Sequence, residues 1–224
     1  MNSRELAGLL DQHGLNLAAV GSGAGWLKHK LRLTDPDPAI RRAAVAFVAA
    51  LIELAGPFGA PVIIGLMQGR SGDGVSREQA VDWLRQVLEE LGAHSARHQT
   101  ALLYEPLNRD ETDLFTRVAQ TREFLDSLRA QNVLLLLDLF HMNLEEPDLA
   151  AAVRLAGDKL GHVHFADSNR QAMGFGYTDM APIARALRDI GYRGFVSAEI
   201  LPLPDSDTAA KQAAASFRRW FAKL

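Results

Sequence analysis

Short apolar runs alternate along this chain with longer segments in which apolar residues recur every three or four positions. The run 133–138, for example, is almost entirely leucine. A short continuous apolar run predicts a strand covered on both faces, whereas the three-to-four spacing predicts an amphipathic helix. We therefore expect six strands, at residues 15–20, 61–66, 101–105, 133–138, 162–165 and 195–199.

Helical segments with recognisable start and stop signals separate these strands. One opens within residues 34–38 and stops at Gly56, and another begins at Ser76, where Gln79 completes a capping box. We expect helices near residues 3–14, 34–55, 76–91, 112–128, 147–156, 182–190 and 207–224. Uninterrupted alternation of strand and helix predicts a parallel α/β fold, organised as a single domain over residues 1–224.

Composition adds to this picture mainly by what it excludes. The 224 residues are 48% hydrophobic and 23% charged, which is ordinary for a globular protein and excludes a disordered chain. Acidic residues outnumber basic ones, so the formal net charge is −3 and no nucleic-acid partner is expected. The chain has no cysteine, which excludes disulfides, zinc–thiolate sites and cysteine nucleophiles.

The sequence carries no signal for export or for insertion into a membrane. Its first residues show charge and helical spacing instead of an apolar signal segment. The most apolar stretch, residues 43–55, is interrupted by Glu53 and is too short to span a bilayer. We therefore expect a cytoplasmic protein with no membrane partner.

Candidate chemistry stands where four of the predicted strands end. Glu105, Asp138, His164 and Glu199 follow one another at intervals of 33, 26 and 35 residues, about one strand–helix unit each time. In a parallel barrel the carboxyl ends of all strands open onto one face, where active sites lie. Three carboxylates and one imidazole form an oxygen-rich donor set that suits Mn²⁺, Mg²⁺ or Co²⁺.

Each of these residues also has an ordinary structural interpretation. A single carboxylate at a strand end is commonly a helix N-cap or an ion-pair partner. A histidine within His162-Val163-His164 is commonly a hydrogen-bonded core residue. Four such residues at successive strand ends favour a shared metal site over four separate coincidences.

Two glycine-rich segments are weaker signals. Residues 21–25 follow the first predicted strand but lack the third glycine of a dinucleotide-binding pattern, so we expect a mobile loop at the rim of the pocket. Gly174-Phe175-Gly176 follows the fifth strand, where either a lid over the site or an ordinary turn fits.

The motifs around the strand ends carry a resemblance to a known family. They are Glu105-Pro-Leu-Asn-Arg109, Asp138-Leu-Phe-His-Met-Asn143, His162-Val-His-Phe165, Asp167-Ser-Asn-Arg170 and Ser197-Ala-Glu199. Their order and spacing, from about Leu15 onward, resemble the sugar phosphate isomerase/epimerase family of xylose-isomerase-like TIM barrels. Within it, the ketose 3-epimerases of the D-tagatose/D-allulose type and the hydroxypyruvate isomerases look most similar.

The resemblance implies a site and an activity. It implies one divalent metal ion, with Mn²⁺ preferred, held by Glu105, Asp138, His164 and Glu199. It further implies substrate contacts from Glu111, His141 and Arg170, a sugar or sugar phosphate as substrate, and a homo-oligomeric enzyme.

The expected reaction removes a proton from the carbon beside a carbonyl and passes through an enediolate. We hypothesise that Glu105 and Glu199 act on opposite faces of the substrate, one removing the proton and the other returning it. Return to the same carbon gives an epimer, the ketose 3-epimerase reaction. Return to the neighbouring carbon gives aldose–ketose isomerisation, as in hydroxypyruvate isomerases, which is the alternative.

The strand count complicates this reading. A TIM barrel has eight strands in about 250 residues, whereas only six are predicted here. We therefore expect a TIM-barrel-like fold with six of its eight strand–helix units, the first two being absent. Such a chain could instead be a weakly active barrel that serves as a binding or assembly subunit. An apurinic endonuclease with three zinc ions is a further alternative, disfavoured because its additional histidine ligands are lacking.

Overall fold

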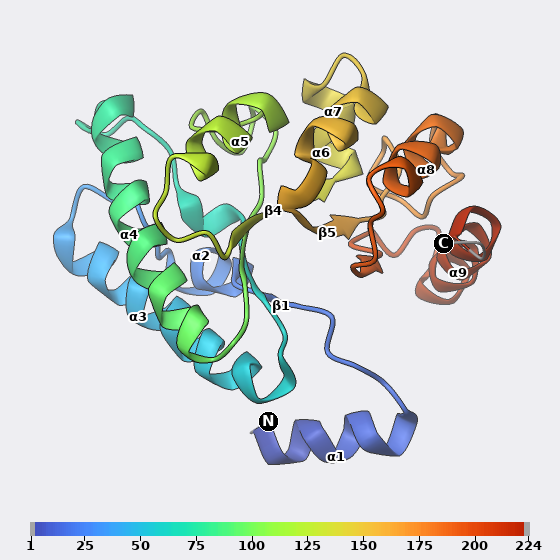
Figure 1. The fold of residues 1–224 in the computed structure, drawn as a ribbon, viewed down its shortest axis with the longest axis horizontal. Helices are drawn as coiled ribbons and strands as arrows, with labels where there is room; N and C mark the ends of the chain where they lie inside the picture. The colour runs from blue at the N-terminus through green and yellow to red at the C-terminus, as the bar shows by residue number, and fades with distance from the viewer. Residues whose placement is uncertain (1–2, 222–224) are drawn as a thin grey trace. The chain divides into compact units, whose positions relative to one another are not determined.

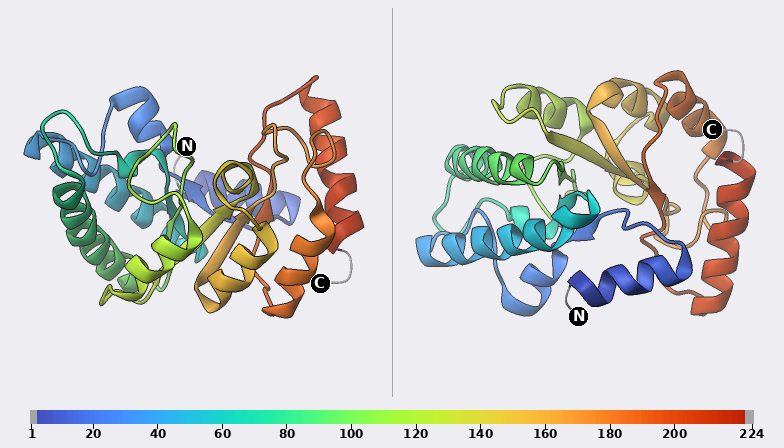
Figure 2. Two further views of the ribbon diagram at one scale, coloured as in Figure 1. Left: turned by 90° about the horizontal axis from the view of Figure 1, so that it is seen from above. Right: turned by 60° about the horizontal axis from the view of Figure 1, so that its bottom comes forward.

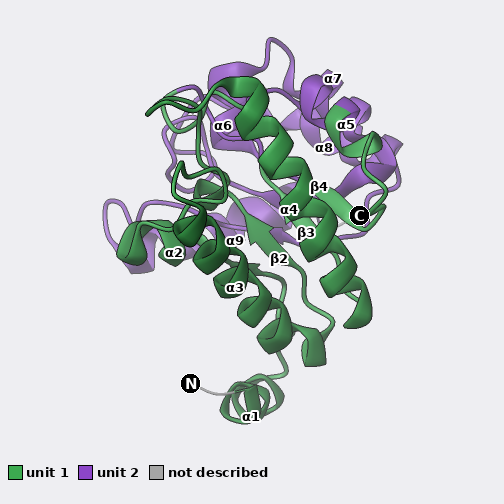
Figure 3. Ribbon diagram, turned by 90° about the vertical axis from the view of Figure 1, so that its left-hand side faces the viewer, with its two compact units in different colours: residues 1–105, 110–114, 124–134 green, residues 106–109, 115–123, 135–224 purple. Residues whose placement is uncertain are grey.

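The computed structural model describes residues 3–221, which form two compact units (Figure 3). Unit 1 contains the described residues up to 105 together with 110–114 and 124–134. Unit 2 contains residues 106–109 and 115–123 and the described residues from 135 onward. The chain therefore crosses between the units several times around the ends of its third and fourth strands.

Unit 1 is built on three short parallel strands. These are β1 (Val20–Gly21), β2 (Val62–Ile64) and β3 (Leu102–Tyr104), which pair in chain order. Val20 is in register with Val62, and Val62 is in register with Leu102. β2 and β3 are fully buried, as expected for strands covered on both faces.

Four α-helices of unit 1 are α1 (Ser3–His13), α2 (Gly23–His29), α3 (Pro38–Ala55) and α4 (Arg77–Arg97), with two 3₁₀ turns at Gly56–Phe58 and Leu66–Gln68. The two long helices α3 and α4 pack side by side (Figure 1, Figure 2). Ser76 caps α4 as the sequence predicts, accepting a hydrogen bond from the Gln79 amide, and Asp37 caps α3 by accepting one from the Ala39 amide.

Unit 2 carries the second set of parallel strands. β5 (Leu160–His164) pairs with β4 (Val133–Asp138) on one side and with β6 (Val196–Ser197) on the other. The register places Asp138 opposite His164, and His164 opposite Ser197. The polar strand ends of unit 2 are therefore neighbours across the sheet.

The helices α6 (Leu139–Glu145), α7 (Leu149–Ala156), α8 (Met180–Asp189) and α9 (Ser206–Phe221) belong to unit 2, and a 3₁₀ turn lies at Gly157–Lys159. α7 and α8 pack side by side (Figure 1). The helix α5 (Val118–Asp126) begins in unit 2 and ends in unit 1. Among residues 3–221, no helix is both long enough and apolar enough to cross a membrane.

Within residues 3–221, six parallel strands that alternate with helices confirm the predicted α/β architecture. The helix expected at 112–128 starts later, at Val118. Thr112 explains the delay, because its hydroxyl donates to the Gly69 carbonyl and accepts from the Leu114 amide, which holds this segment as a loop. The expected helix over 207–224 is confirmed as far as Phe221, and its last three residues lie outside the described range.

Residues 15–25 differ most from expectation. The first strand is confined to Val20–Gly21, and the glycine-rich segment expected to be a mobile loop forms the helix α2. The reason is tertiary: Gly25 is buried against the side chain of Met67, and a Cβ at this position would collide with the methionine sulfur. From the local sequence Gly25 suggests a flexible loop, but in the structure its lack of a side chain allows close packing against Met67.

Candidate metal centre

Asp138 ends β4, and its two carboxylate oxygens have different surroundings. Oδ1 accepts a 2.8 Å hydrogen bond from the Phe140 amide and so caps α6. Oδ2 is buried and has no hydrogen-bond partner among residues 3–221. It lies 3.6 Å from Nδ1 of His164. Asp138 is therefore both a helix cap and the source of one buried carboxylate oxygen without a hydrogen-bond partner, which a cation can satisfy.

His164 ends β5 and lies between two carboxylates. Its Nδ1 atom is 3.0 Å from Oε2 of Glu199, in addition to its contact with Asp138. One ligand atom from each of these three residues lies within 4.8 Å of the others. Two carboxylates and one imidazole gathered at this spacing are a donor set for a hard or borderline divalent ion.

Glu199 follows β6 and is the exposed member of this group, with 51% of its side chain accessible. The hydrogen bond with His164 holds the pKa of Glu199 below its ordinary value, against the opposing effect of burial, and the charge of Arg170 acts in the same direction as His164. A second histidine positions the strand: Nε2 of His162 lies 2.7 Å from Oγ of Ser197, two residues before Glu199.

Burial also lowers the pKa of His162, to about 4, so this ring is neutral near pH 7. The ordinary interpretation of His162 as a hydrogen-bonded core residue is therefore the one that its surroundings support. Its partner Ser197 was not singled out from the sequence as more than part of a motif. Two features of the sequence could have identified the pair: the alternating histidines of His162-Val163-His164, and a serine two residues before the carboxylate that follows the next strand.

Two of the expected substrate-binding residues lie beside this group. His141, on α6, is buried with Nε2 4.0 Å from Oδ2 of Asp138, and its Nδ1 lies 2.9 Å from the side-chain nitrogen of Asn108. The guanidinium of Arg170 is 3.5 Å from Oε2 of Glu199 and lies over the ring of Phe140. Unit 2 thus brings together five of the seven residues that the sequence singled out.

The other two, Glu105 and Glu111, lie in unit 1. Glu105 directly follows β3 and is buried, and its amide donates to the Ile64 carbonyl. Its carbonyl accepts a 3.0 Å hydrogen bond from Nε2 of Gln68, a fully buried residue that also contacts the Tyr104 hydroxyl. Glu111 is partly buried in the segment 110–114. Gln68 was not predicted to have a role, yet it supports the backbone on which Glu105 stands.

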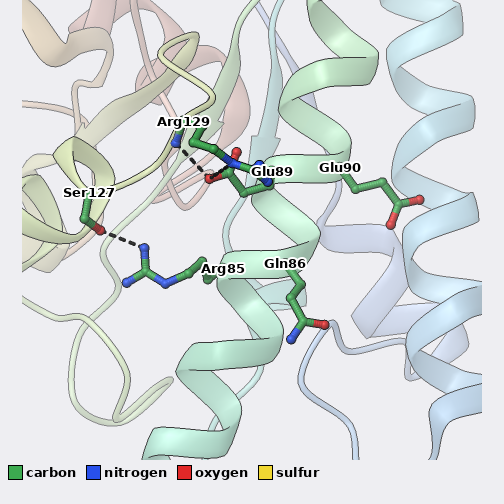
Figure 4. Close-up of a pocket in the computed structure, with 6 residues that line it drawn as sticks. All are labelled: Arg85, Gln86, Glu89, Glu90, Ser127 and Arg129. Carbon is green, nitrogen blue, oxygen red and sulfur yellow. Dashed lines mark hydrogen bonds and ion pairs between the residues drawn. The ribbon is translucent and has the colours of Figure 1, made fainter.

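A cavity of about 610 Å³ on unit 1 is chemically different. It is lined by Arg85, Gln86, Glu89, Glu90, Ser127 and Arg129 (Figure 4). Its charged groups are used to hold the chain that precedes β4: Glu89 accepts from the backbone amides of Arg129 and Ala130. Arg85 donates to the Ser127 hydroxyl, as the dashed line in Figure 4 shows. These pairings are structural.

Several known proteins are similar to this chain in sequence. D-psicose 3-epimerase of Enterocloster bolteae is 38% identical over 134 residues, which are 60% of this chain and 42% of that protein. D-psicose 3-epimerase of Ruminiclostridium cellulolyticum is 33% identical over 171 residues, 75% of this chain and 58% of that protein. The chain therefore spans about half the length of the curated relatives it matches.

A solved structure extends the similarity to the fold. The crystal structure of D-psicose 3-epimerase from Clostridium cellulolyticum H10 with D-tagatose matches with a TM-score of 0.85 at 25% identity. The match covers 99% of this chain and 84% of that one. The TIM-barrel-like architecture expected from the sequence is thereby confirmed.

The family model described as xylose isomerase-like TIM barrel matches residues 1–221. The chain belongs to the xylose isomerase-like TIM barrel family.

Proposed function

We propose that this chain is a metal-dependent ketose 3-epimerase. The observation that carries the proposal is the grouping of Asp138, His164 and Glu199 at adjacent strand ends, with one buried oxygen of Asp138 uncommitted. The 3-epimerase activity of the relatives from E. bolteae and R. cellulolyticum supports the choice of reaction.

We assign four ligands to the metal ion: Asp138, His164, Glu199 and, from the end of β3, Glu105. The fit rests on the oxygen-rich donor set and on the orphaned Asp138 oxygen, which favour Mn²⁺, with Mg²⁺ or Co²⁺ as substitutes. When bound, such an ion acts as a Lewis acid that stabilises negative charge developing on the substrate oxygens. Glu105 is assigned from its strand-end position and from the family resemblance.

Glu199 and Glu105 are the proposed acid–base pair. The lowered pKa of Glu199 keeps its carboxylate ionised near neutral pH, which is the state required to accept a proton from carbon. Its neighbour Arg170 can hold a substrate oxygen while remaining close to Glu199. Glu105, in its protonated form, then gives its proton to the opposite side of the same carbon, so that the configuration at C3 inverts.

Three residues are proposed to bind the sugar. His141 stands beside Asp138, and Arg170 stands beside Glu199, so both can donate hydrogen bonds to substrate oxygens next to the reacting carbon. Glu111 is the third, assigned from the resemblance alone. The substrate is a ketose in free or phosphorylated form, and the working enzyme is proposed to be a homo-oligomer in the cytoplasm.

The test is turnover of a panel of ketoses, ketose phosphates and hydroxypyruvate with Mn²⁺, in deuterated water. We expect Mn²⁺-dependent formation of the C3 epimer, with deuterium from the solvent at C3. Chromatography and NMR measure the epimer and the position of the deuterium. Deuterium at the neighbouring carbon would instead indicate the isomerase reaction, and Mn²⁺ binding without turnover would favour a binding or assembly subunit.

A matched pair of variants distinguishes loss of the metal site from loss of a helix cap. Asp138→Asn and Asp148→Asn both alter an aspartate that caps a helix, and asparagine is an equally good cap. Only Asp138 has a buried oxygen next to His164. We expect Asp138→Asn to abolish turnover and Asp148→Asn to preserve it. Equal turnover in the two variants would contradict the proposed function.

A further inference from the structure

The carboxylate of Asp167 is an anchor for the chain that follows β5. Asp167 is fully buried, and its two oxygens together accept four backbone hydrogen bonds. Oδ1 accepts from the amides of Ser168 at 2.7 Å and Thr178 at 3.0 Å. Oδ2 accepts from the amides of Gly174 at 2.7 Å and Gly176 at 2.9 Å. We name the segment 168–178, closed upon this side chain, the Asp167 loop.

The loop has little room for rearrangement around its anchor. A Cβ added at Gly176 would lie 2.5 Å from Oδ1 of Asp167, so the backbone must approach the carboxylate as closely as only glycine allows. The Met173 carbonyl accepts hydrogen bonds from Gln212 and Ser216 of α9. The Thr178 hydroxyl lies 2.9 Å from the side-chain nitrogen of Asn143 on α6. The loop is therefore tied to the helices on both sides as well as to Asp167.

The charge state of the anchor agrees with this geometry. Burial of Asp167 would raise its pKa, but the hydrogen bonds from the amides of Thr178, Gly174 and Gly176 outweigh burial and hold the pKa below its ordinary value. A buried carboxylate with this many amide donors is an ionised acceptor, and hydrogen bonds to a charged acceptor are about twice as strong as neutral ones.

The consequence for the site passes through Arg170. Its amide donates a 2.8 Å hydrogen bond to the Asp167 carbonyl, and its backbone is left-handed, with φ at 59°. Its carbonyl accepts a 2.7 Å hydrogen bond from the amide of Leu201, two residues beyond Glu199. Its guanidinium lies 3.5 Å from the Glu199 carboxylate. Arg170 is thus held at both ends, and through it the exposed segment around Glu199 is held as well.

We propose that Asp167 is a positioning residue: by closing the loop 168–178 it holds Arg170 and Glu199 in the arrangement that binds and reacts with the sugar. It does not touch the substrate, because both of its oxygens are occupied by the loop amides. This inference rests on the proposed epimerase function for its catalytic consequence, whereas the anchoring itself is independent of any activity.

The first experiment measures anchoring without reference to catalysis. Amide hydrogen exchange is followed in wild type, Asp167→Asn and the remote matched variant Asp148→Asn. We expect the amides of Gly174, Gly176 and Thr178 to exchange about tenfold faster in Asp167→Asn, because an amide side chain can accept at only one of its two atoms. Asp148→Asn should leave them unchanged. Unchanged exchange in Asp167→Asn would overturn the proposal.

A second variant covers the case in which Asp167→Asn does not fold. Gly176→Ala keeps the carboxylate but forces a methyl group against Oδ1, so it should loosen the same three amides. Trypsin gives an independent reading, since Arg170 is itself a cleavage site within the loop. We expect faster cleavage after Arg170 in either variant, and equal cleavage in wild type and Gly176→Ala would count against the anchor.

The second experiment measures the effect on the reaction. We expect kcat/KM for the ketose, measured at saturating Mn²⁺, to fall about 100-fold in Asp167→Asn, the effect of misplacing reacting groups by about 1 Å. Recovery of the wild-type kcat/KM at saturating Mn²⁺ would limit the effect of Asp167 to metal binding and reject a role in positioning the reacting groups. If wild type shows no turnover, the proposed function fails, and the exchange experiment still decides the anchor.

Discussion

Nδ1 of His164 lies 3.0 Å from Oε2 of Glu199 and also faces Oδ2 of Asp138, so that one ring nitrogen is shared by two carboxylates. One of these carboxylates is buried and the other is half exposed. A cation between two carboxylates held this close, whether a proton on the imidazole or a metal ion, removes the repulsion between them. A divalent ion satisfies this arrangement better than a single proton, because it neutralises both carboxylates.

Asp138→Asn should remove the stabilisation that Mn²⁺ confers. At a metal concentration 100 times the dissociation constant, a single site adds about 2.7 kcal/mol to the free energy of unfolding. We expect this gain in wild type and in Asp148→Asn, and little or none in Asp138→Asn, measured by calorimetry with and without Mn²⁺. An equal gain in all three proteins would place the metal elsewhere.

Glu199→Gln should reduce kcat by about 10²–10⁴, the usual contribution of one general acid–base group. The side chain is half exposed, so its replacement should leave the free energy of unfolding of the metal-free protein nearly unchanged. Steady-state kinetics and urea unfolding measure the two quantities. The exposed Glu90→Gln serves as the control, and full turnover of Glu199→Gln with metal bound would refute the assigned role.

Ser197→Ala should destabilise the fold through His162. The change removes the hydroxyl that lies 2.7 Å from Nε2 of a buried, neutral imidazole, and an unsatisfied buried polar group costs about 1–3 kcal/mol. Urea unfolding should show this loss for Ser197→Ala and not for the exposed Ser206→Ala. Because Ser197 lies two residues before Glu199, we also expect weaker Mn²⁺ binding. A stability equal to that of Ser206→Ala would contradict the structural role of this pair.

The ion pair between Glu145 and Arg109 should make stability depend on pH. Burial alone would raise the pKa of Glu145, but hydrogen bonds from the Arg109 side chain and amide outweigh it and hold the pKa below 4.5. A lowered folded-state pKa means that the pair stabilises the protein above pH 4.5, and that this contribution is lost as the pH falls through the folded-state value.

Glu145→Gln should therefore lower the free energy of unfolding by about 1–2 kcal/mol at pH 7. Below pH 4.5 the difference from wild type should shrink, because wild-type Glu145 becomes protonated as well. Urea titrations at a series of pH values measure the difference. A gap that stayed constant between pH 7 and pH 3 would show that the charge of Glu145 is not its source.

Two glycine-to-alanine changes in helices should have opposite signs. Gly8 in α1 has no atom within 4 Å of an added Cβ, so alanine should stabilise the protein by about 0.5–1 kcal/mol. At Gly92 in α4 the added Cβ would lie 2.7 Å from the Ala130 side chain and 3.1 Å from Val133, and the crowding should cost about 1–3 kcal/mol. Thermal unfolding measures the change in stability of each variant. A stabilised Gly92→Ala would show that the chain around Ala130 and Val133 shifts to make room for the added methyl group.

Local pattern was sufficient to place β2 to β6 and the polar residues that follow them, but it put the first strand at residues 15–20, whereas β1 is Val20–Gly21. Apolar runs predict β4 and β5 because side chains covered on both faces must be apolar along the whole strand. Parallel pairing then brings the next polar residues together, which is why Asp138, His164 and Glu199 were predicted to be neighbours and are found so. The place of Glu105 in that set, the roles of Glu111, His141 and Arg170, and the two absent strand–helix units stay predictions.

Other features depend on residues distant in the chain, and only the tertiary structure decided them. The glycine-rich segment became the helix α2 because Gly25 packs against Met67, and the loop at 112–117 exists because Thr112 bonds to Gly69. In the sequence Asp167 is only one residue of a motif, and its role as an anchor is visible only where the fold brings the amides of Ser168, Gly174, Gly176 and Thr178 to its carboxylate. The spacing of apolar residues indicates which face of each segment packs against the core. The hydrogen-bond partners of individual buried polar groups are determined only when the segments pack together.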